Sequence, residues 1–514
     1  MSMPVNSWPD HFSPTVVRGA HGSSALSSLS VALEAWRRGL TVTFHSHDLE
    51  WYSISSDEQN VRFNFARPDS ITSQADTQVM ARKWDTNRAL EASGVPVPKG
   101  VLLAAGSVTE QELREQADTL GYPLVLKPNR GSMGRGVLVN LRTWEELKAG
   151  FDHLVGPLGK KEVLMETHHE GDDHRLLVIG DRMVAAARRV PANVTGDGEH
   201  TISELIRLKN KSRAGNPFLS TGPIKVDYEV LGCLREQGLE PDTVPSAGRY
   251  IYLRKIANAS AGGDVIDVTD DMPDEVKDAA VRAVQAIPRT VIAGVDVLYG
   301  SDTLSNTEYT IIELNPRPHI GVNMYPSVGT GPDVPRAYID YLFPTSSRRE
   351  LPGDRLLKFN LQTIREPLRT GVADGVTVAN LPDHDFPYRR RFRLQEGANT
   401  RRISRGQRRN LLAIARRDGV AGYMRPVKEA SSKRKRTFLR TLRRRLLERS
   451  IPEVGSAVEV VLAGADEQST RRMRVAISKH LGALDQGQEW RRVLTTGFSI
   501  DPALVSSAGR QEQE

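Results

Sequence analysis

Two apolar, strand-like segments carry the feature that most restricts how this chain can fold. "GVDVLYG" places Asp296, and "IIELNPRP" places Glu313 and Asn315, among apolar residues. Because alternate residues of a strand face the same side, Glu313 and Asn315 point the same way. A solvated strand face explains the pattern poorly, since the flanking residues are apolar and an unpaired buried carboxylate is costly. The segments predict neighbouring buried strands that share a set of oxygen ligands, which suits Mg²⁺.

A glycine-rich stretch, "LVLKPNRGSMGRGV" from Leu124 to Val137, is the second candidate site. Lys127 ends an apolar run, and Gly131, Gly134 and Gly136 follow it. The spacing matches neither G-x-x-x-x-G-K-[ST] nor G-x-G-x-x-G, so the stretch alone does not identify a nucleotide site. Together with the acidic strands it predicts one, because a lysine and backbone amides can hold phosphates that Mg²⁺ bridges to carboxylates.

The length and the cysteine content restrict the class of protein. A chain of 514 residues is expected to form several domains. The single cysteine, Cys233, excludes an internal disulfide and a cysteine-based metal cluster, and it fits a reducing compartment. The N-terminus lacks the pattern of a signal peptide. No apolar run approaches the roughly 20 residues that span a bilayer. We therefore expect a cytoplasmic protein.

The positive charge is concentrated near the C-terminus. The whole chain carries +7, but residues 388–450 hold 22 Lys and Arg against 4 Asp and Glu. Within this region, residues 428–450 form a basic insertion that is expected to be partly helical. It could be a solvated surface helix, or it could bind an acidic partner, an anionic membrane surface or nucleic acid. Phe438 is the only aromatic residue within 433–449, so base stacking is not supported.

The order of predicted elements divides the chain into four parts. Residues 1–82 read as a small α/β domain, with a helix over Leu26–Trp36 that Gly39 ends. Residues 83–346 alternate strands and helices, with a hairpin at Gly180-Asp181. Residues 347–386 read as a linker and 387–514 as a separate α/β unit. The fold class is therefore α/β and α+β, multidomain.

Five stretches carry a family resemblance in the same order along the chain: "KWDTNRALEASGVPVP", "LVLKPNRGSMGRGV", "DHRLLVIGDRMVAAARRVPANVTGDGEHTISELI", "VPSAGRYIYLRKIANASAGGDVIDVTDD" and "AGVDVLYG…IIELNPRP". From about Lys83 to Phe343, roughly half of the chain, the sequence resembles the ATP-grasp superfamily of carboxylate–amine ligases. Within this superfamily it resembles the ATP-grasp domains of cyanophycin synthetase and of the bifunctional glutathione synthetase. The other halves of those enzymes are not recognisable here, so we expect a stand-alone ligase.

The resemblance implies a role for each matching position. For ATP it implies Lys83 and Lys127 at the phosphates, Gly131, Ser132, Gly134 and Gly136 in the covering loop, Glu166 and Thr167 after a strand as the adenine hinge, and Asp173 at the ribose. For catalysis it implies Arg175, Arg188 and Arg254 at the phosphoryl group, and Asn258 with the "SAGG" turn at the substrate end. For the metal it implies Asp296, Glu313 and Asn315, holding two Mg²⁺ ions that Mn²⁺ can replace. Arg188 could instead be a surface arginine, and Arg317 and His319 could meet a substrate carboxylate or be structural.

The implied activity is ATP-dependent formation of an amide bond between a carboxylate and an amine. The route is an acyl phosphate, and the expected substrates are amino acids or a small peptide. A homodimer is a further expectation from the relatives. Two alternatives remain open at this point. One is a protein that binds nucleic acid or another anion on an inactive ATP-grasp scaffold, and the other is an acylphosphatase.

The last alternative rests on a weaker resemblance in residues 387–514. The expected order there is strand, loop, helix, strand, then strand and helix, which is similar to acylphosphatase, a small ferredoxin-like α/β sandwich. Arg408 stands where that family places an arginine, in a loop before the first helix. The position of the family's asparagine is taken by Pro426, which has no side-chain donor. We therefore expect a binding or assembly module here.

Overall fold

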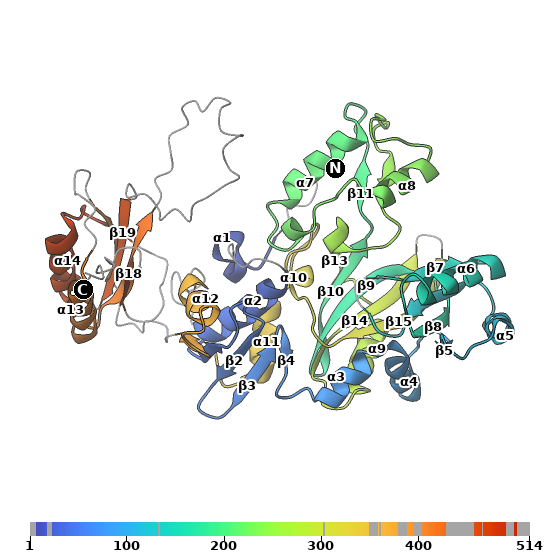
Figure 1. Cartoon of the computed structure of the whole chain (residues 1–514), viewed down its shortest axis with the longest axis horizontal. Coiled ribbons are helices and arrows are strands. Elements are labelled where there is room, and N and C mark those ends of the chain that lie inside the picture. Colours follow the sequence, from blue (N-terminus) through green and yellow to red (C-terminus); the bar gives the residue numbers. More distant parts are fainter. Residues whose placement is uncertain are drawn as a thin grey trace, which may run out of the picture. The chain divides into compact units, whose positions relative to one another are not determined.

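A computed structural model of the chain (Figure 1) describes residues 7–17, 23–131, 134–301, 304–348, 358, 361–378, 388–394, 403–427, 457–464, 466–489 and 498–500. The chain divides into two compact units. The first comprises Met1–Arg348 and Ile364–Val376, and the second comprises Arg349–Thr363 and Thr377–Glu514. In the described part of the chain, no helix has the length and apolar character needed to cross a bilayer.

The first sheet of unit 1 is formed mainly by N-terminal strands, in the order β16-β1-β2-β3-β4. The predicted helix is α2 (Ser23–Arg37), and the apolar residues that define its spacing, from Leu26 to Trp36, are all buried. The stretch predicted to be a linker also contains regular structure, because α12 (Leu361–Arg369) and β16 (Val376–Val378) lie within it. The other strands are β1 (Thr41–Phe44), β2 (Trp51–Ser55), β3 (Asn60–Asn64) and β4 (Arg67–Pro68).

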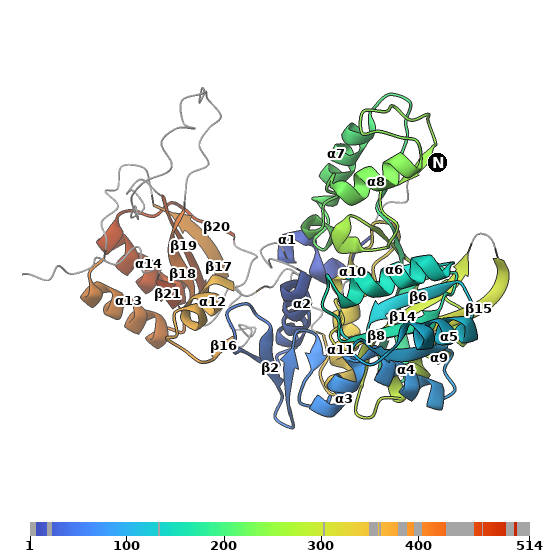
Figure 2. The ribbon, with the colours of Figure 1, turned by 45° about the vertical axis from the view of Figure 1, so that its right-hand side comes forward.

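A second sheet carries the glycine-rich stretch, in the order β5-β8-β6-β7. Figure 2 shows helices α5 and α6 beside its strands. Leu126 on β6 and Met165 on β8 turn into a core with these helices, so Lys127 and Glu166, one position on, face the other side. The bounds are β5 (Gly100–Ala104), α5 (Glu110–Leu120), β6 (Leu124–Pro128), β7 (Leu138–Leu141), α6 (Trp144–Val155) and β8 (Glu162–Thr167).

The central sheet is antiparallel, in the order β13-β10-β9-β14-β15. Helix α9 (Asp274–Gln285) covers one face, where Leu176, Val178 and Val295 join its core. The predicted hairpin is present, since Gly180 follows β9 with a positive φ of 62° and β10 begins at Arg182. The remaining bounds are α3 (Gln74–Met80), α4 (Lys83–Ala92), β9 (Asp172–Ile179), β10 (Arg182–Val190), β13 (Asp264–Asp267), β14 (Ile292–Ser301) and β15 (Leu304–Asn315).

Residues 191–263 form a subdomain between β10 and β13, with a core of its own that includes Ile206, Leu234 and Ile251. Its elements are β11 (Asn193–Thr195), α7 (Ile202–Arg213), η2 (Leu219–Thr221), α8 (Tyr228–Glu236), β12 (Tyr250–Tyr252) and η3 (Ala259–Ala261). The other helices of unit 1 are η1 (Asp10–Phe12), α1 (Pro14–Val17), α10 (Gly321–Met324) and α11 (Val334–Leu342).

Unit 2 contains a sheet in the order β20-β17-β19-β18-β21, and two helices share its core. The expected order of elements is found. Arg408, however, lies inside α13 rather than in a loop before it, which contradicts the expected position of a phosphate-binding arginine. The similarity to acylphosphatase stays a prediction, and the basic insertion lies outside the described residues. The bounds are β17 (Tyr388–Arg393), α13 (Arg405–Arg417), β18 (Ala421–Val427), β19 (Ala457–Gly464), α14 (Glu467–Leu481), β20 (Gln488–Glu489) and β21 (Phe498–Ile500).

Candidate active site

The register of the central sheet brings the predicted oxygen ligands together. Asp296 on β14 is paired with Glu313 on β15, and Gly294 is paired with Asn315. Because alternate residues share a face, all three polar side chains lie on the face opposite to α9. The amide Nδ2 of Asn315 lies 3.5 Å from Oδ2 of Asp296. The sequence pattern predicted that Glu313 and Asn315 share one face, and the structure shows them there together with Asp296.

Two arginines from neighbouring strands surround Asp296. Arg175 on β9 is the register partner of Asp296 and donates to both carboxylate oxygens, with Nη2 at 2.9 Å from Oδ2. Arg189 on β10 lies 3.3 Å from the same oxygen and also pairs with Asp173. Burial opposes ionisation of Asp296, but the two guanidinium groups outweigh burial and lower its pKa. Asp296 is thus a buried carboxylate that stays ionised.

The choice of Arg188 as a phosphate ligand is corrected by this geometry. Arg188 is paired with His174, which faces α9, whereas Arg189 is paired with Asp173 on the carboxylate face. The guanidinium of Arg188 lies 2.8 Å from Asp172. The sequence has two adjacent arginines, and a β-bulge between Met183 and Ala185 breaks the simple alternation. Arg189, which was not predicted, is therefore the member of this pair that lies on the carboxylate face.

Lys83 links the glycine loop to the acidic strands. It is the first residue of α4, and its Nζ donates to the carbonyl of Gly131 at 2.9 Å and to Oε1 of Glu313 at 3.2 Å. The side chain thus joins two of the sequence candidates that are far apart in the chain. A phosphate group entering between them would meet an ammonium group that is already in place.

Lys127 belongs to a buried polar chain of three side chains. Its Nζ lies 2.6 Å from Oε2 of Glu166, and Asn87 on α4 donates to the other oxygen at 2.7 Å. Lys127 and Glu166 are both almost fully buried. The expectation that Glu166 and Thr167 follow the strand is corrected, because they are the last two residues of β8. Asn87 was not predicted, since an asparagine inside a helical pattern has no feature that points to Glu166.

Gly134 of the glycine loop lies next to a residue of the subdomain. Gly134 has a positive φ of 69°, and a Cβ at this residue would stand 3.9 Å from Cγ2 of Ile256. Gly136 is more confined, since a Cβ there would lie 3.1 Å from a methyl group of Leu154. Larger residues would be strained at both positions. Ser132 lies outside the described residues.

Arg254 and Asn258 lie between β12 and η3, outside the strands that form the carboxylate face. Arg254 is buried, pairs with Asp227 and Glu229 of the α8 region, and donates through Nε to the carbonyl of Ala261 at 3.1 Å. Oδ1 of Asn258 accepts from the amide of Ser260 at 3.0 Å. A backbone amide can only donate, so the oxygen of Asn258 must face it, and Nδ2 remains as a donor.

The residues fit a magnesium ion by the chemistry of their donors. Asp296, Glu313 and Asn315 offer carboxylate and amide oxygens on one face, which is the donor type that Mg²⁺ prefers. Among the described residues, no group of three or more His, Cys, Asp and Glu side chains gathers as a metal site. The predicted oxygen donors on this face are therefore two carboxylates and one amide.

Comparisons with known proteins show what the chain is similar to. Residues 80–199 match the family model of the RimK-like ATP-grasp domain. Cyanophycin synthetase of Crocosphaera subtropica is 35% identical over 335 residues, which cover 63% of this chain and 37% of that protein. The glutathione biosynthesis bifunctional protein GshAB of Listeria innocua is 33% identical over 271 residues, which cover 52% of this chain and 34% of that protein.

A search of solved structures found a crystal structure of a bifunctional glutathione synthetase from Pasteurella multocida. It has a TM-score of 0.49 and 25% sequence identity, and the match covers 62% of this chain and 43% of that chain. The chain thus spans little more than a third of the length of the curated relatives named above.

Proposed function

The chain carries a RimK-like ATP-grasp domain, and we propose that it is an ATP-dependent ligase that joins a carboxylate to an amine. The observation that carries this proposal is the single sheet face on which Asp296, Glu313, Asn315, Arg175 and Arg189 lie together. Oxygen ligands next to arginines match the needs of phosphoryl transfer to a carboxylate, which are positioning and charge neutralisation.

Each group of residues has a proposed part in binding ATP. Lys83 and Lys127 contact the phosphates, and the loop of Gly131–Gly136 covers them. Glu166 and Thr167 end β8 at the adenine hinge. Asp173 is held by Arg189, so we propose that it orients this arginine, in place of the ribose contact implied by the family resemblance. Mg²⁺, bound by Asp296, Glu313 and Asn315, would neutralise the charge of the phosphate oxygens.

The proposed reaction has two steps. A substrate carboxylate oxygen forms a bond to the γ-phosphorus as the bond to the bridging oxygen breaks, which gives an acyl phosphate and ADP. The amine nitrogen then forms a bond to the acyl carbon, phosphate leaves with the electron pair of the C–O bond, and the nitrogen loses a proton. Arg175 and Arg189 stabilise charge on the transferred phosphoryl group, and Nδ2 of Asn258 donates to the substrate oxygen. Amino acids or a small peptide are the proposed substrates.

The test is phosphate release from ATP and Mg²⁺ across a panel of amino acids and dipeptides, singly and in pairs. Turnover that requires one particular carboxylate and one particular amine, with a product of the summed mass less water, would support the ligase. ATP binding without turnover for any pair would count against amino-acid and dipeptide substrates. Failure to bind ATP would overturn the proposal itself.

The pair of adjacent arginines provides a first prediction. We expect Arg189→Met to lower turnover by about 10²–10³-fold, because it removes a cation from the carboxylate face. Arg188→Met, the matched control on the other face, is expected to change turnover by about twofold or less. Steady-state kinetics of both purified variants measures the difference. Equal losses in the two variants would contradict the assignment of faces.

A further inference from the structure

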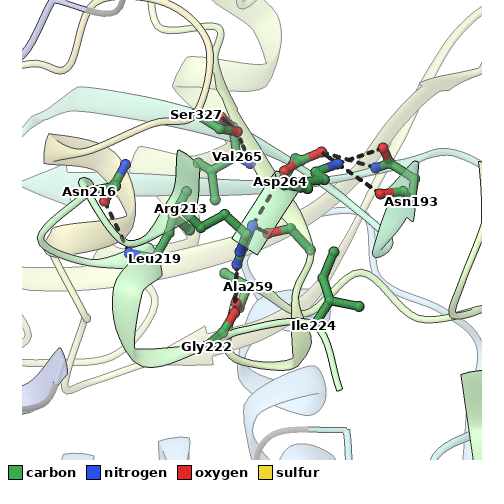
Figure 3. Close-up of polar contacts among 12 residues, drawn as sticks. Asn193, Arg213, Asn216, Leu219, Gly222, Ile224, Ala259, Asp264, Val265 and Ser327 are labelled. Atoms are coloured by element: carbon green, nitrogen blue, oxygen red, sulfur yellow. Dashed lines mark hydrogen bonds and ion pairs between the residues drawn. The ribbon is translucent and has the colours of Figure 1, made fainter. Parts of the chain in front are cut away.

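A buried arginine at the end of α7 binds the backbone behind the substrate turn, residues 258–263. Arg213 is only 5% exposed. Figure 3 shows its guanidinium among carbonyl groups from separate stretches of the subdomain. Nη2 donates to the carbonyl of Gly222 at 2.8 Å and to that of Ala259 at 3.1 Å, and Nη1 donates to the carbonyl of Gly263 at 3.0 Å. One side chain therefore connects the two ends of the turn to the chain after η2.

A second layer of contacts holds Arg213 in this place. Asp264 accepts from Nη1 of Arg213 at 3.3 Å and from Lys209, one turn earlier on α7, at 2.5 Å. Lys209 also donates to the carbonyl and the side chain of Asn193. Asp264 thus offers one carboxylate oxygen to Arg213 and the other to Lys209, and this charged contact favours the orientation in which the two terminal nitrogens of Arg213 reach the carbonyls.

The turn itself leaves little space for displacement. A Cβ at Gly222 would lie 2.6 Å from the carbonyl oxygen of Ala259, and a Cβ at Gly263 would lie 2.6 Å from that of Val190. The amides of Ala261, Gly262 and Gly263 all donate to carbonyls within the turn. The turn is thus a closely packed backbone loop. Its amides donate within the turn, and the carbonyls of Ala259 and Gly263 accept from Arg213.

The turn lies against the face that carries the arginines of the site. Ala259 packs in one cluster with Ala187 and Val265. Ala187 is the register partner of Arg175, and Val265 is the register partner of Arg189. At the other end of the same segment, Ile256 stands next to Gly134 of the glycine loop. A displaced turn would therefore move Asn258 relative to both the phosphates and the arginines.

We infer that Arg213 is a positioning residue for the carboxylate substrate: it holds the turn of residues 258–263, and thereby Nδ2 of Asn258, at the distance from Arg175 and Arg189 that the reaction needs. This inference rests on the proposed ligase function. Arg213 does not touch the substrate. Its removal changes the place of the substrate carboxylate and leaves the ATP contacts of Lys83 and Lys127 as they are.

The test compares Arg213→Met and Arg213→Lys with Arg207→Met, a matched control, since Arg207 is exposed on the same helix. Hydrogen–deuterium exchange of residues 256–264 measures the turn without any need for turnover. We expect exchange there to rise at least about tenfold in Arg213→Met, because carbonyl partners from separate stretches are lost together. Exchange in β6 and β8 is expected to stay unchanged, as is all exchange in Arg207→Met.

Kinetics supplies the second measurement. The KM for the carboxylate is expected to rise by about 10- to 100-fold in Arg213→Met, while the KM for ATP changes by about twofold or less. In Arg213→Lys a single ammonium nitrogen replaces the two guanidinium nitrogens that donate to the carbonyls. The exchange of residues 256–264 and the KM for the carboxylate in this variant should therefore fall between those of the wild type and of Arg213→Met.

Unchanged exchange in the turn, or an unchanged KM for the carboxylate, in folded Arg213→Met would overturn the inference. If this variant does not fold, Arg213→Lys decides, and wild-type values in it would overturn the inference. If the wild type ligates no pair, the proposed function fails, but the exchange measurement still shows whether Arg213 holds the turn. The two failures are therefore distinguishable.

Discussion

Replacing Glu313 by alanine is expected to lower ATP turnover by about 10³-fold or more. The carboxylate is one of two acidic ligands proposed for the magnesium ion, and it also accepts from Nζ of Lys83 at 3.2 Å. Its loss removes a metal contact and releases a lysine that is proposed to hold phosphate. Phosphate release, measured against the concentration of Mg²⁺ with a substrate pair that supports turnover in the wild type, reports the effect.

The stability of this variant should change little, which separates a chemical defect from an unfolded protein. The side chain of Glu313 is 29% exposed and its partner is a single lysine, and such pairs contribute about 1 kcal/mol or less. Glu115→Ala, an exposed glutamate on α5, is the matched control and should retain full turnover. Wild-type turnover in Glu313→Ala at all Mg²⁺ concentrations would refute the metal assignment.

Replacing Lys127 by methionine is expected to destabilise the protein by about 3–5 kcal/mol. The change leaves the carboxylate of Glu166 buried with Asn87 as its one remaining side-chain partner among the described contacts. An uncompensated buried charge is more costly than the ion pair that it replaces. Urea denaturation of the variant and of the wild type measures the free energy of unfolding.

A change at Glu166, the partner of Lys127, tests whether the charge pair causes the loss of stability. Lys127→Met combined with Glu166→Gln removes both charges, so the double variant should recover most of the lost stability. Lys161→Met, which alters an exposed lysine just before β8, should change stability by about 0.5 kcal/mol or less. The double variant should still fail to bind ATP tightly, because the proposed phosphate ligand is absent. A double variant that is less stable than Lys127→Met would contradict a charge-pair origin.

Local patterns were sufficient to predict that Glu313 and Asn315, two of the proposed metal ligands, share one face of a strand. Alternation along a strand is a property of the backbone alone, so Glu313 and Asn315 had to share a face wherever the strand was placed. The hairpin at Gly180 followed in the same way from its turn residues. The pairing of Asp296 with Glu313 depends in addition on the register between β14 and β15, which alternation along one strand does not give.

Long-range contacts were beyond the reach of these patterns. The choice between Arg188 and Arg189 depended on a β-bulge, whose single extra residue reverses the facing of every side chain after it. Asn87 meets Glu166 only because α4 lies beside β8. The ion pairs of Arg254 with Asp227 and Glu229 were likewise not foreseen, and its role at the phosphoryl group stays a prediction.

The sequence by itself determined the chemical groups and their order. It contained the oxygen ligands on apolar strands, the lysines, the glycine loop and the turn at Asn258, because their spacing depends on local backbone geometry. The tertiary structure alone decided which groups meet: Arg189 with Asp296, Lys83 with Glu313, and Arg213 with three carbonyls of its subdomain. Most of these contacts join residues that are distant in the chain, and only the packing of sheets and helices brings such residues within reach of a hydrogen bond.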